Sequence, residues 1–290
     1  MSPDSASVAT RALAFVALFQ ATGTGIFLVL FGRMLSTSAA AIRRIGTIAA
    51  VVGIVFLLAH QLFEAARMAD DWSGLFEADL QIIGWTSSNT VFHVGAVVGL
   101  ICVAASLVRQ SPGGTRGAVL GSTIALCAFL LTGHTSVHRL RWVLAPLLAV
   151  HVLIVAFWFG ALVPLYLLCQ KESLTVAAGV VKRFSAIAGR LVPVIAVAGL
   201  LLAIILSAAD TSMLLRPYGQ LLLAKLAGFG LLMFCAAYNK WRLTPAIVGG
   251  QHAALRSLRR VIAAEYAIII AVLCVTAVLT TFYSPGMSAA

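Results

Sequence analysis

The feature that most constrains this chain is a series of long apolar runs separated by short polar loops. A helix needs about 20 mostly apolar residues to cross a bilayer, and eight runs reach or approach that length. The sequence lacks the short alternating strands of an outer-membrane barrel. It therefore predicts an all-α integral membrane protein, a single polytopic domain over residues 1–290 with a bundle of about eight transmembrane helices. The predicted spans are roughly 12–32, 45–68, 89–108, 118–138, 142–169, 187–208, 218–239 and 261–283, the fourth being the least apolar.

The composition excludes several classes of protein. Of the 290 residues, 61% are hydrophobic and 10% are charged, whereas a soluble domain carries about 25% charged residues. A soluble globular enzyme and a disordered tail are therefore excluded. The net charge of +11 does not indicate nucleic-acid binding, because the basic residues lie between apolar runs and form no patch on a soluble fold. We expect the lipid bilayer as the surroundings of this chain and no nucleic-acid partner.

The basic residues are concentrated in alternate loops, and the second loop is acidic. Short loops rich in Lys and Arg remain on the cytoplasmic side, so the odd-numbered loops are predicted to be cytoplasmic. Both termini then face outward (N-out/C-out), as an even number of spans requires. This pattern predicts a multi-pass membrane protein. The residues concerned are Arg33, Arg43, Arg44, Arg109, Arg116, Lys171, Lys182, Arg183, Lys240, Arg242, Arg256, Arg259 and Arg260 in the odd loops, and Asp70, Asp71, Glu77 and Asp79 in the second.

The second loop, roughly residues 69–88, is the longest and combines acidic with large apolar side chains. Trp72 and Trp85 lie within it. Tryptophan concentrates at the boundary between lipid and water, so we predict a short interfacial helix on the outer surface.

Five of the six histidines fall in the outer part of the predicted membrane region, on four consecutive spans. Polar side chains are costly within a bilayer and are functional candidates there. A single histidine in a span more often has a structural role, but five at similar depth favour a metal site. The predicted metal-binding residues are His60, Glu64, His93, His134, His138 and His151.

Helical spacing groups some of these residues. His60 and Glu64 are separated by four positions, as are His134 and His138, and residues at this spacing share a helix face. Imidazole suits copper, zinc, iron and nickel. Met68, one turn beyond Glu64, and Met213 favour Cu(I) slightly because thioethers are soft ligands.

Two other charged residues lie within predicted spans. Lys225 lies about two turns from the outward end of the seventh span. It either extends its ammonium group to the surface or pairs with Glu64 or Asp210. Glu265, near the cytoplasmic start of the last span, is expected to pair with loop arginines such as Arg259.

Several common functional motifs are missing from the sequence. No phosphate-binding loop, no Asp-Lys-Thr-Gly phosphorylation segment and no Ser/His/Asp or His-Glu-x-x-His arrangement occurs. We therefore expect no nucleotide partner and no enzymatic activity.

Motifs in the second half of the chain resemble those of the CopD copper-resistance family. The resemblance covers roughly residues 130–285, whereas residues 1–130 match only in general layout. Ala161 is one departure, because the family often has a second glycine there. The matching segments are Thr132-Gly133-His134, the His…Trp-x-Gly segment His151–Gly160, Arg183-Phe184-Ser185, Pro217–Lys225, Asn239 with Pro245, and Leu258-Arg259-Arg260 through Glu265 to Pro285.

The resemblance implies a protein of the bacterial inner (cytoplasmic) membrane with eight spans, which moves copper toward the cytoplasm and often works with a small periplasmic copper-binding protein. It implies functional importance for His134, His151, Lys225 and Glu265, with Trp158 in the same motif as His151. His60, Glu64, His93 and His138 are predicted from their placement alone.

Three interpretations remain open at this point. The first is a copper transporter or copper-delivery protein whose outward histidine cluster receives Cu(I) from a periplasmic donor. The second is a redox protein that holds b-type haem between His93 and His151, or between His60 and His134, because bis-imidazole haem sites are built from histidines on neighbouring helices. The third is an assembly partner that delivers copper to a metalloenzyme without transporting it.

Overall fold

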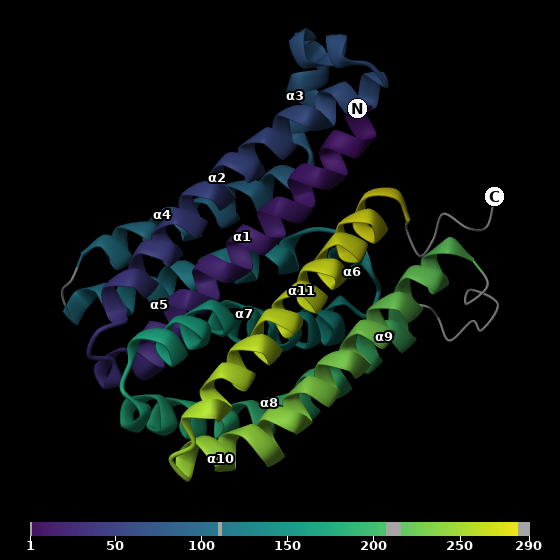
Figure 1. Ribbon diagram of the computed structural model, residues 1–290. Coiled ribbons are helices and arrows are strands. Elements are labelled where there is room, and N and C mark those ends of the chain that lie inside the picture. The colour runs from purple at the N-terminus through teal and green to yellow at the C-terminus, as the bar shows by residue number, and fades with distance from the viewer. Residues whose placement is uncertain (1, 110–111, 207–215, 284–290) are drawn as a thin grey trace.

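The computed structural model describes residues 2–109, 112–206 and 216–283, and every regular element within these residues is helical. This confirms the predicted all-α class. The elements in chain order (Figure 1) are α1 (Pro3–Phe31), η1 (Gly32–Met34), α2 (Ala39–Ala69), η2 (Trp72–Phe76), α3 (Ala78–Thr86), α4 (Ser88–Val108), α5 (Pro112–Cys127), η3 (Ala128–Leu131), α6 (His134–Val137), α7 (Arg141–Lys171), α8 (Leu174–Leu206), α9 (Pro217–Tyr238), η5 (Asn239–Leu243), α10 (Thr244–Val248) and α11 (His252–Phe282).

Seven helices among the described residues are long and apolar enough to cross a membrane. The fourth predicted span corresponds to a shorter apolar helix, Arg116–Leu131, made of α5 and η3. Several helices extend beyond their apolar runs. For example, α8 begins at Leu174, well before the predicted start near 187, because the segment that carries Lys182 and Arg183 is also helical. The chain is thus a multi-pass membrane protein, and a count of eight spans remains a prediction.

One end of the bundle joins the beginning of α1 to the ends of α2 and α11. The Arg11 guanidinium of α1 donates to the Thr280 carbonyl at 2.9 Å, and that of Arg67 in α2 donates to the Thr281 carbonyl at 3.3 Å. Since His60 of α2 also lies here, we call this the His60 end. The beginning of α1 and the end of α11 therefore lie on the same side, as predicted for the two termini.

The opposite end, which we call the Glu172 end, joins the first and fifth loops. Glu172 follows α7 and accepts hydrogen bonds from the segment before α2. Both loops were predicted to lie on the same side, and this contact agrees. The α4 helix begins at the His60 end, and α7 finishes at the Glu172 end. The intervening α5 and η3 run back along α4 toward the His60 end (Figure 1).

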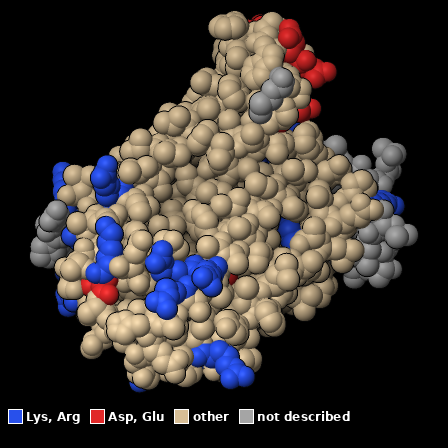
Figure 2. All heavy atoms as spheres, viewed as in Figure 1, with Lys and Arg blue, Asp and Glu red and all other residues tan. Residues whose placement is uncertain are grey.

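Charged side chains are separated along the bundle. On the face shown in Figure 2, most Lys and Arg side chains lie toward the end of the bundle away from α3. The acidic side chains gather mainly near α3. The segregation follows the loop pattern of the sequence, and an N-out/C-out orientation is the assignment that the positive-inside rule predicts for it.

The second loop is helical, as predicted. It forms η2 and α3, and Phe76 and Ile82 project from it with exposed fractions of 89% and 60%. Large exposed apolar side chains beside the acidic Glu77 and Asp79 are typical of a helix at a lipid surface.

Close glycine contacts bring the helices together. A Cβ atom on Gly160 of α7 would lie 2.4 Å from the Gly23 Cα atom of α1, so neither position admits a side chain without a shift. The Gln20 amide donates to the Gly160 carbonyl at 3.1 Å across the same crossing. The glycine of the Trp-x-Gly motif therefore fixes α7, and with it Trp158, against α1.

Glu172 is the acceptor that joins the two halves of the chain at the Glu172 end. Its carboxylate accepts from the backbone N–H groups of Ser36, Thr37 and Ser38 and from the hydroxyls of Ser36 and Ser38. Partial burial alone would raise the pKa of Glu172, but the hydrogen bonds from Ser36, Ser38 and Thr37 prevail and lower it to about 2. The ionised carboxylate therefore stabilises the start of α2.

The depressed pKa of Glu172 predicts a dependence of stability on pH. A carboxyl group whose pKa falls from 4.5 to about 2 on folding contributes stability above pH 4.5 and loses it as the pH drops toward 2. Glu172→Gln is expected to lower the thermal unfolding temperature of the detergent-solubilised protein at pH 7. It should also flatten the decline in that temperature below pH 4.5. Glu77→Gln is the matched control, since Glu77 is exposed and makes no capping hydrogen bond to α3. Equal behaviour of the two variants would contradict this role.

Candidate metal-binding site

Buried polar side chains from three helices meet at the His60 end. Ser7 and Arg11 lie four positions apart on α1, and His60 and Glu64 lie four positions apart on α2, so each pair occupies one helix face. His93 extends from the first turns of α4. His60 and His93 are 2% and 4% exposed. Part of the predicted metal-binding set is therefore brought together in the interior of the bundle.

Both ring nitrogens of His60 have neighbours. Its Nε2 atom lies 2.6 Å from the Nε atom of Arg11, and its Nδ1 atom lies 3.4 Å from a carboxylate oxygen of Glu64. A guanidinium group only donates hydrogen bonds, so the Nε2 atom of His60 must be the acceptor. The imidazole is therefore inferred to carry its proton on Nδ1, toward Glu64.

His93 presents the opposite situation. Its Nδ1 atom lies 2.8 Å from the Asn89 carbonyl, which only accepts, so Nδ1 carries the proton. The lone pair of His93 is then on Nε2, which is buried and has no hydrogen-bond partner among the described residues. The rings of His60 and His93 are 5.2 Å apart between centroids and lie edge to face. A buried imidazole lone pair thus adjoins a second imidazole.

Glu64 balances part of the positive charge in this cluster. It accepts from the Ser7 hydroxyl at 3.0 Å and lies 3.6 Å from the guanidinium of Arg67. Its side chain is 13% exposed. With Arg11 and Arg67 both present, the cluster carries more positive than negative charge.

His151 and Lys225 lie in a different part of the molecule. His151 of α7 lies against α8, where a Cβ atom on Gly199 would be 3.4 Å from its ring, and Lys225 is near enough to act on it electrostatically. No ion pair joins Lys225 to Glu64 among the described residues, and Asp210 lies outside them. Of the two predicted partners of Lys225, Glu64 instead contacts Ser7, His60 and Arg67.

The predicted pair His134 and His138 does not share a continuous helix. His134 begins the four-residue helix α6, and the structure does not describe its side chain. His138 follows α6 in extended backbone, and its Nδ1 atom accepts from the Leu140 N–H at 3.0 Å. Met68 is 45% exposed, and Met213 lies outside the described residues.

Glu265 forms a second buried cluster, and its predicted pairing with Arg259 is wrong. Glu265 of α11 is 3% exposed and accepts from the Asn239 amide at 2.7 Å and from the Trp158 indole N–H at 3.4 Å. Arg259 instead donates to the Tyr166 hydroxyl at 3.0 Å and lies over its ring, because it faces α7. Asn239 begins the π-helical segment η5, a local widening that is frequent at functional sites.

The predicted ligands whose side chains the structure describes do not all gather into one site. Among the described residues, no group of three or more His, Cys, Asp or Glu side chains has the arrangement needed to hold a metal. The structure brings together His60, His93 and Glu64, and it adds Arg11 and Ser7. The sequence contained a signal for Arg11, which is the only basic residue before Arg33 and lies at the edge of the first apolar run.

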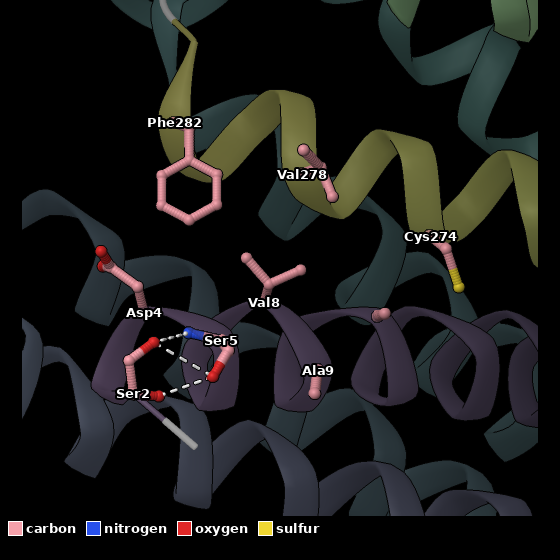
Figure 3. A pocket seen from close by; sticks show the side chains of 9 residues that line it. Ser2, Asp4, Ser5, Val8, Ala9, Cys274, Val278 and Phe282 are labelled. Carbon is pink, nitrogen blue, oxygen red and sulfur yellow. Dashed lines mark hydrogen bonds between the residues drawn. The ribbon is translucent and has the colours of Figure 1, made fainter.

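An open groove lies beside this cluster between α1 and α11 (Figure 3). Val8 and Ala9 line it from α1, and Cys274, Val278 and Phe282 line it from α11. Its polar rim is formed by Ser2, Asp4 and Ser5, and the Ser2 hydroxyl donates a hydrogen bond to the Ser5 hydroxyl. None of the histidine side chains that the structure describes lines the groove, and the candidate site is the cluster around His60 and His93.

Two family models match the chain. The model described as "Copper resistance protein D-like, N-terminal domain" matches residues 1–140, and the model described as "Copper resistance protein D" (CopD) matches residues 178–279. The searches of curated proteins and of solved structures gave no match. The second model falls within the region whose motifs carried the resemblance, and the first covers the part that matched only in layout. The chain belongs to the CopD family of copper resistance proteins.

Proposed function

We propose that this protein transports or delivers copper across the inner membrane, and that His60 and His93 form its first Cu(I)-binding site. The observation that carries this proposal is the buried Nε2 lone pair of His93 beside the ring of His60. A buried acceptor without a partner is costly, and its retention is explained when a cation uses it. Membership of a copper resistance family makes copper the expected cation.

The ligand chemistry favours Cu(I). Imidazole nitrogens bind copper well, and a low-coordinate site with few charged ligands suits a monovalent ion. Metal–imidazole bonds are about 2 Å long, and two rings with centroids 5.2 Å apart are close enough for one ion to bridge a nitrogen of each. Glu64 would then offset the charge of the bound ion from the opposite side of His60.

The same contact argues against the haem hypothesis. That hypothesis paired His93 with His151, or His60 with His134. The structure places His93 against His60 and His151 against Gly199. We therefore propose copper as the cargo of a protein without enzymatic activity and do not propose haem.

Other charged groups of the chain extend the proposal to the entry of copper and to the polar groups beyond the first site. In the N-out/C-out orientation, the acidic second loop lies above the His60 end and raises the local concentration of cations. A periplasmic copper-binding protein is the proposed donor. Further polar groups follow toward the Glu172 end: the partly buried His151 with Lys225, and then the buried Glu265 with Trp158 and Asn239.

The site assignment predicts a specific loss of copper binding. His93→Ala and His60→Ala are each expected to weaken Cu(I) binding at least tenfold, because each substitution removes one of the two proposed ligand nitrogens. Competition with a chromophoric Cu(I) chelator in detergent measures this affinity. His252→Ala is the control, because His252 is exposed at the start of α11. Unchanged affinity in both His60 and His93 variants would contradict the assignment.

Transport and delivery differ in copper flux. If the protein is a transporter, liposomes that contain the wild-type protein are expected to take up Cu(I) faster than empty liposomes, and His93→Ala should abolish the difference. Trapped chelator inside the liposomes reports the flux. Binding without flux would contradict transport and leave delivery as the function.

A further inference from the structure

The hydrogen bond between Arg11 and His60 occupies the atom that a metal would need. The Nε–H group of Arg11 donates to the Nε2 atom of His60 at 2.6 Å. The other ring nitrogen of His60 carries the proton and faces Glu64 at 3.4 Å. A nitrogen lone pair cannot accept a hydrogen bond and coordinate a metal at the same time. His60 therefore has no free lone pair in this structure, whereas His93 has one.

We propose that Arg11 is the gate of the copper site: its guanidinium holds the ligand nitrogen of His60 in the metal-free protein and withdraws when Cu(I) binds between His60 and His93. The inference rests on the proposed copper function. It adds a positioning residue outside the set of metal ligands and explains why the two histidines do not yet form a complete site.

The release of Arg11 requires movement, because a guanidinium group stays protonated in proteins. Arg11 has a second attachment that makes this movement feasible. A terminal nitrogen donates to the Thr280 carbonyl at 2.9 Å and lies 3.4 Å from the Thr280 hydroxyl. The last four carbonyls of a helix lack partners within it, and this end of the helix attracts cations. Arg11 can therefore leave His60 while it stays bound to the end of α11.

This second attachment links the site to the other half of the chain. The cluster is built on α1, α2 and α4, which the N-terminal family model covers, whereas α11 lies almost wholly within the CopD match. A displacement of the end of α11 would pull on Arg11 directly. Copper binding at His60 is thereby coupled to the position of α11, which also carries Glu265.

Arg67 provides a matched comparison within the same cluster. It carries the same charge, donates to the neighbouring Thr281 carbonyl at 3.3 Å and lies 3.6 Å from Glu64. In the part of the chain that the structure describes, Arg67 makes no hydrogen bond to His60, so it repels a cation without occupying a ligand nitrogen. A comparison of the two arginines separates the gate from a general electrostatic effect.

The test compares Arg11→Met with Arg67→Met in the full-length protein in detergent, using Cu(I) and a competing chelator. Loss of a hydrogen bond that competes for the ligand is expected to raise the Cu(I) affinity about tenfold or more in Arg11→Met. Arg67→Met should raise it distinctly less. Equal increases in the two variants, or no increase in Arg11→Met, would overturn the gate.

A second measurement uses the wild-type protein and does not depend on the folding of a variant. Nitrogen NMR of protein labelled at arginine and histidine follows the Nε–H signal of Arg11 and the ring nitrogens of His60 during Cu(I) addition. The gate requires both to change together, and an Arg11 signal that copper leaves unchanged overturns it. If His93→Ala weakens binding while Arg11→Met does not strengthen it, only the gate fails. If neither His60→Ala nor His93→Ala weakens Cu(I) binding, the proposed function fails, and the gate fails together with it.

Discussion

Polar side chains in the interior of this bundle must find partners there, because hydrocarbon offers none and each unpaired group is costly. The arrangement of the buried polar groups follows from this constraint. Glu172 collects the free N–H groups before α2, Glu265 is held by Asn239 and Trp158, and Arg11 and Arg67 satisfy the last carbonyls of α11. The Nε2 atom of His93 is one of the buried polar atoms without a hydrogen-bond partner among the described residues, and its ring lies beside that of His60.

The contacts at the two ends hold the N-terminal helices α1 and α2 to the second half of the chain. At the Glu172 end, the segment after α7 caps the start of α2. At the His60 end, the last turn of α11 anchors arginines from α1 and α2. Between them, α1 crosses α7 at Gly23 and Gly160, where neither position has room for a Cβ atom. A change in the position of α11 relative to α1 and α2 therefore acts at the His60 end, where the proposed copper site lies.

The sequence predicted the helical class, most of the spans and the relative sides of the loops, because apolar length and loop charge act locally along the chain. It also paired His60 with Glu64 correctly, since spacing on one helix determines which side chains share a face. It did not predict that His60 meets His93 and Arg11, because that depends on how three helices rotate about their axes when they pack. The prediction of a Glu265–Arg259 pair was wrong for the same reason. Arg259 faces Tyr166 of α7, and the Glu265 carboxylate accepts a hydrogen bond from Asn239 of η5 instead.

In the proposed copper-bound state, His60 and His93 share one Cu(I) ion once Arg11 has moved aside. X-ray absorption at the copper edge of the Cu(I)-loaded wild-type protein tests it most directly. We expect two imidazole nitrogens at about 2 Å from the copper and the loss of one of them in His93→Ala. A first shell of sulfur at about 2.3 Å, the length typical of metal–thiolate bonds, or a shell that His93→Ala leaves unchanged, would contradict it.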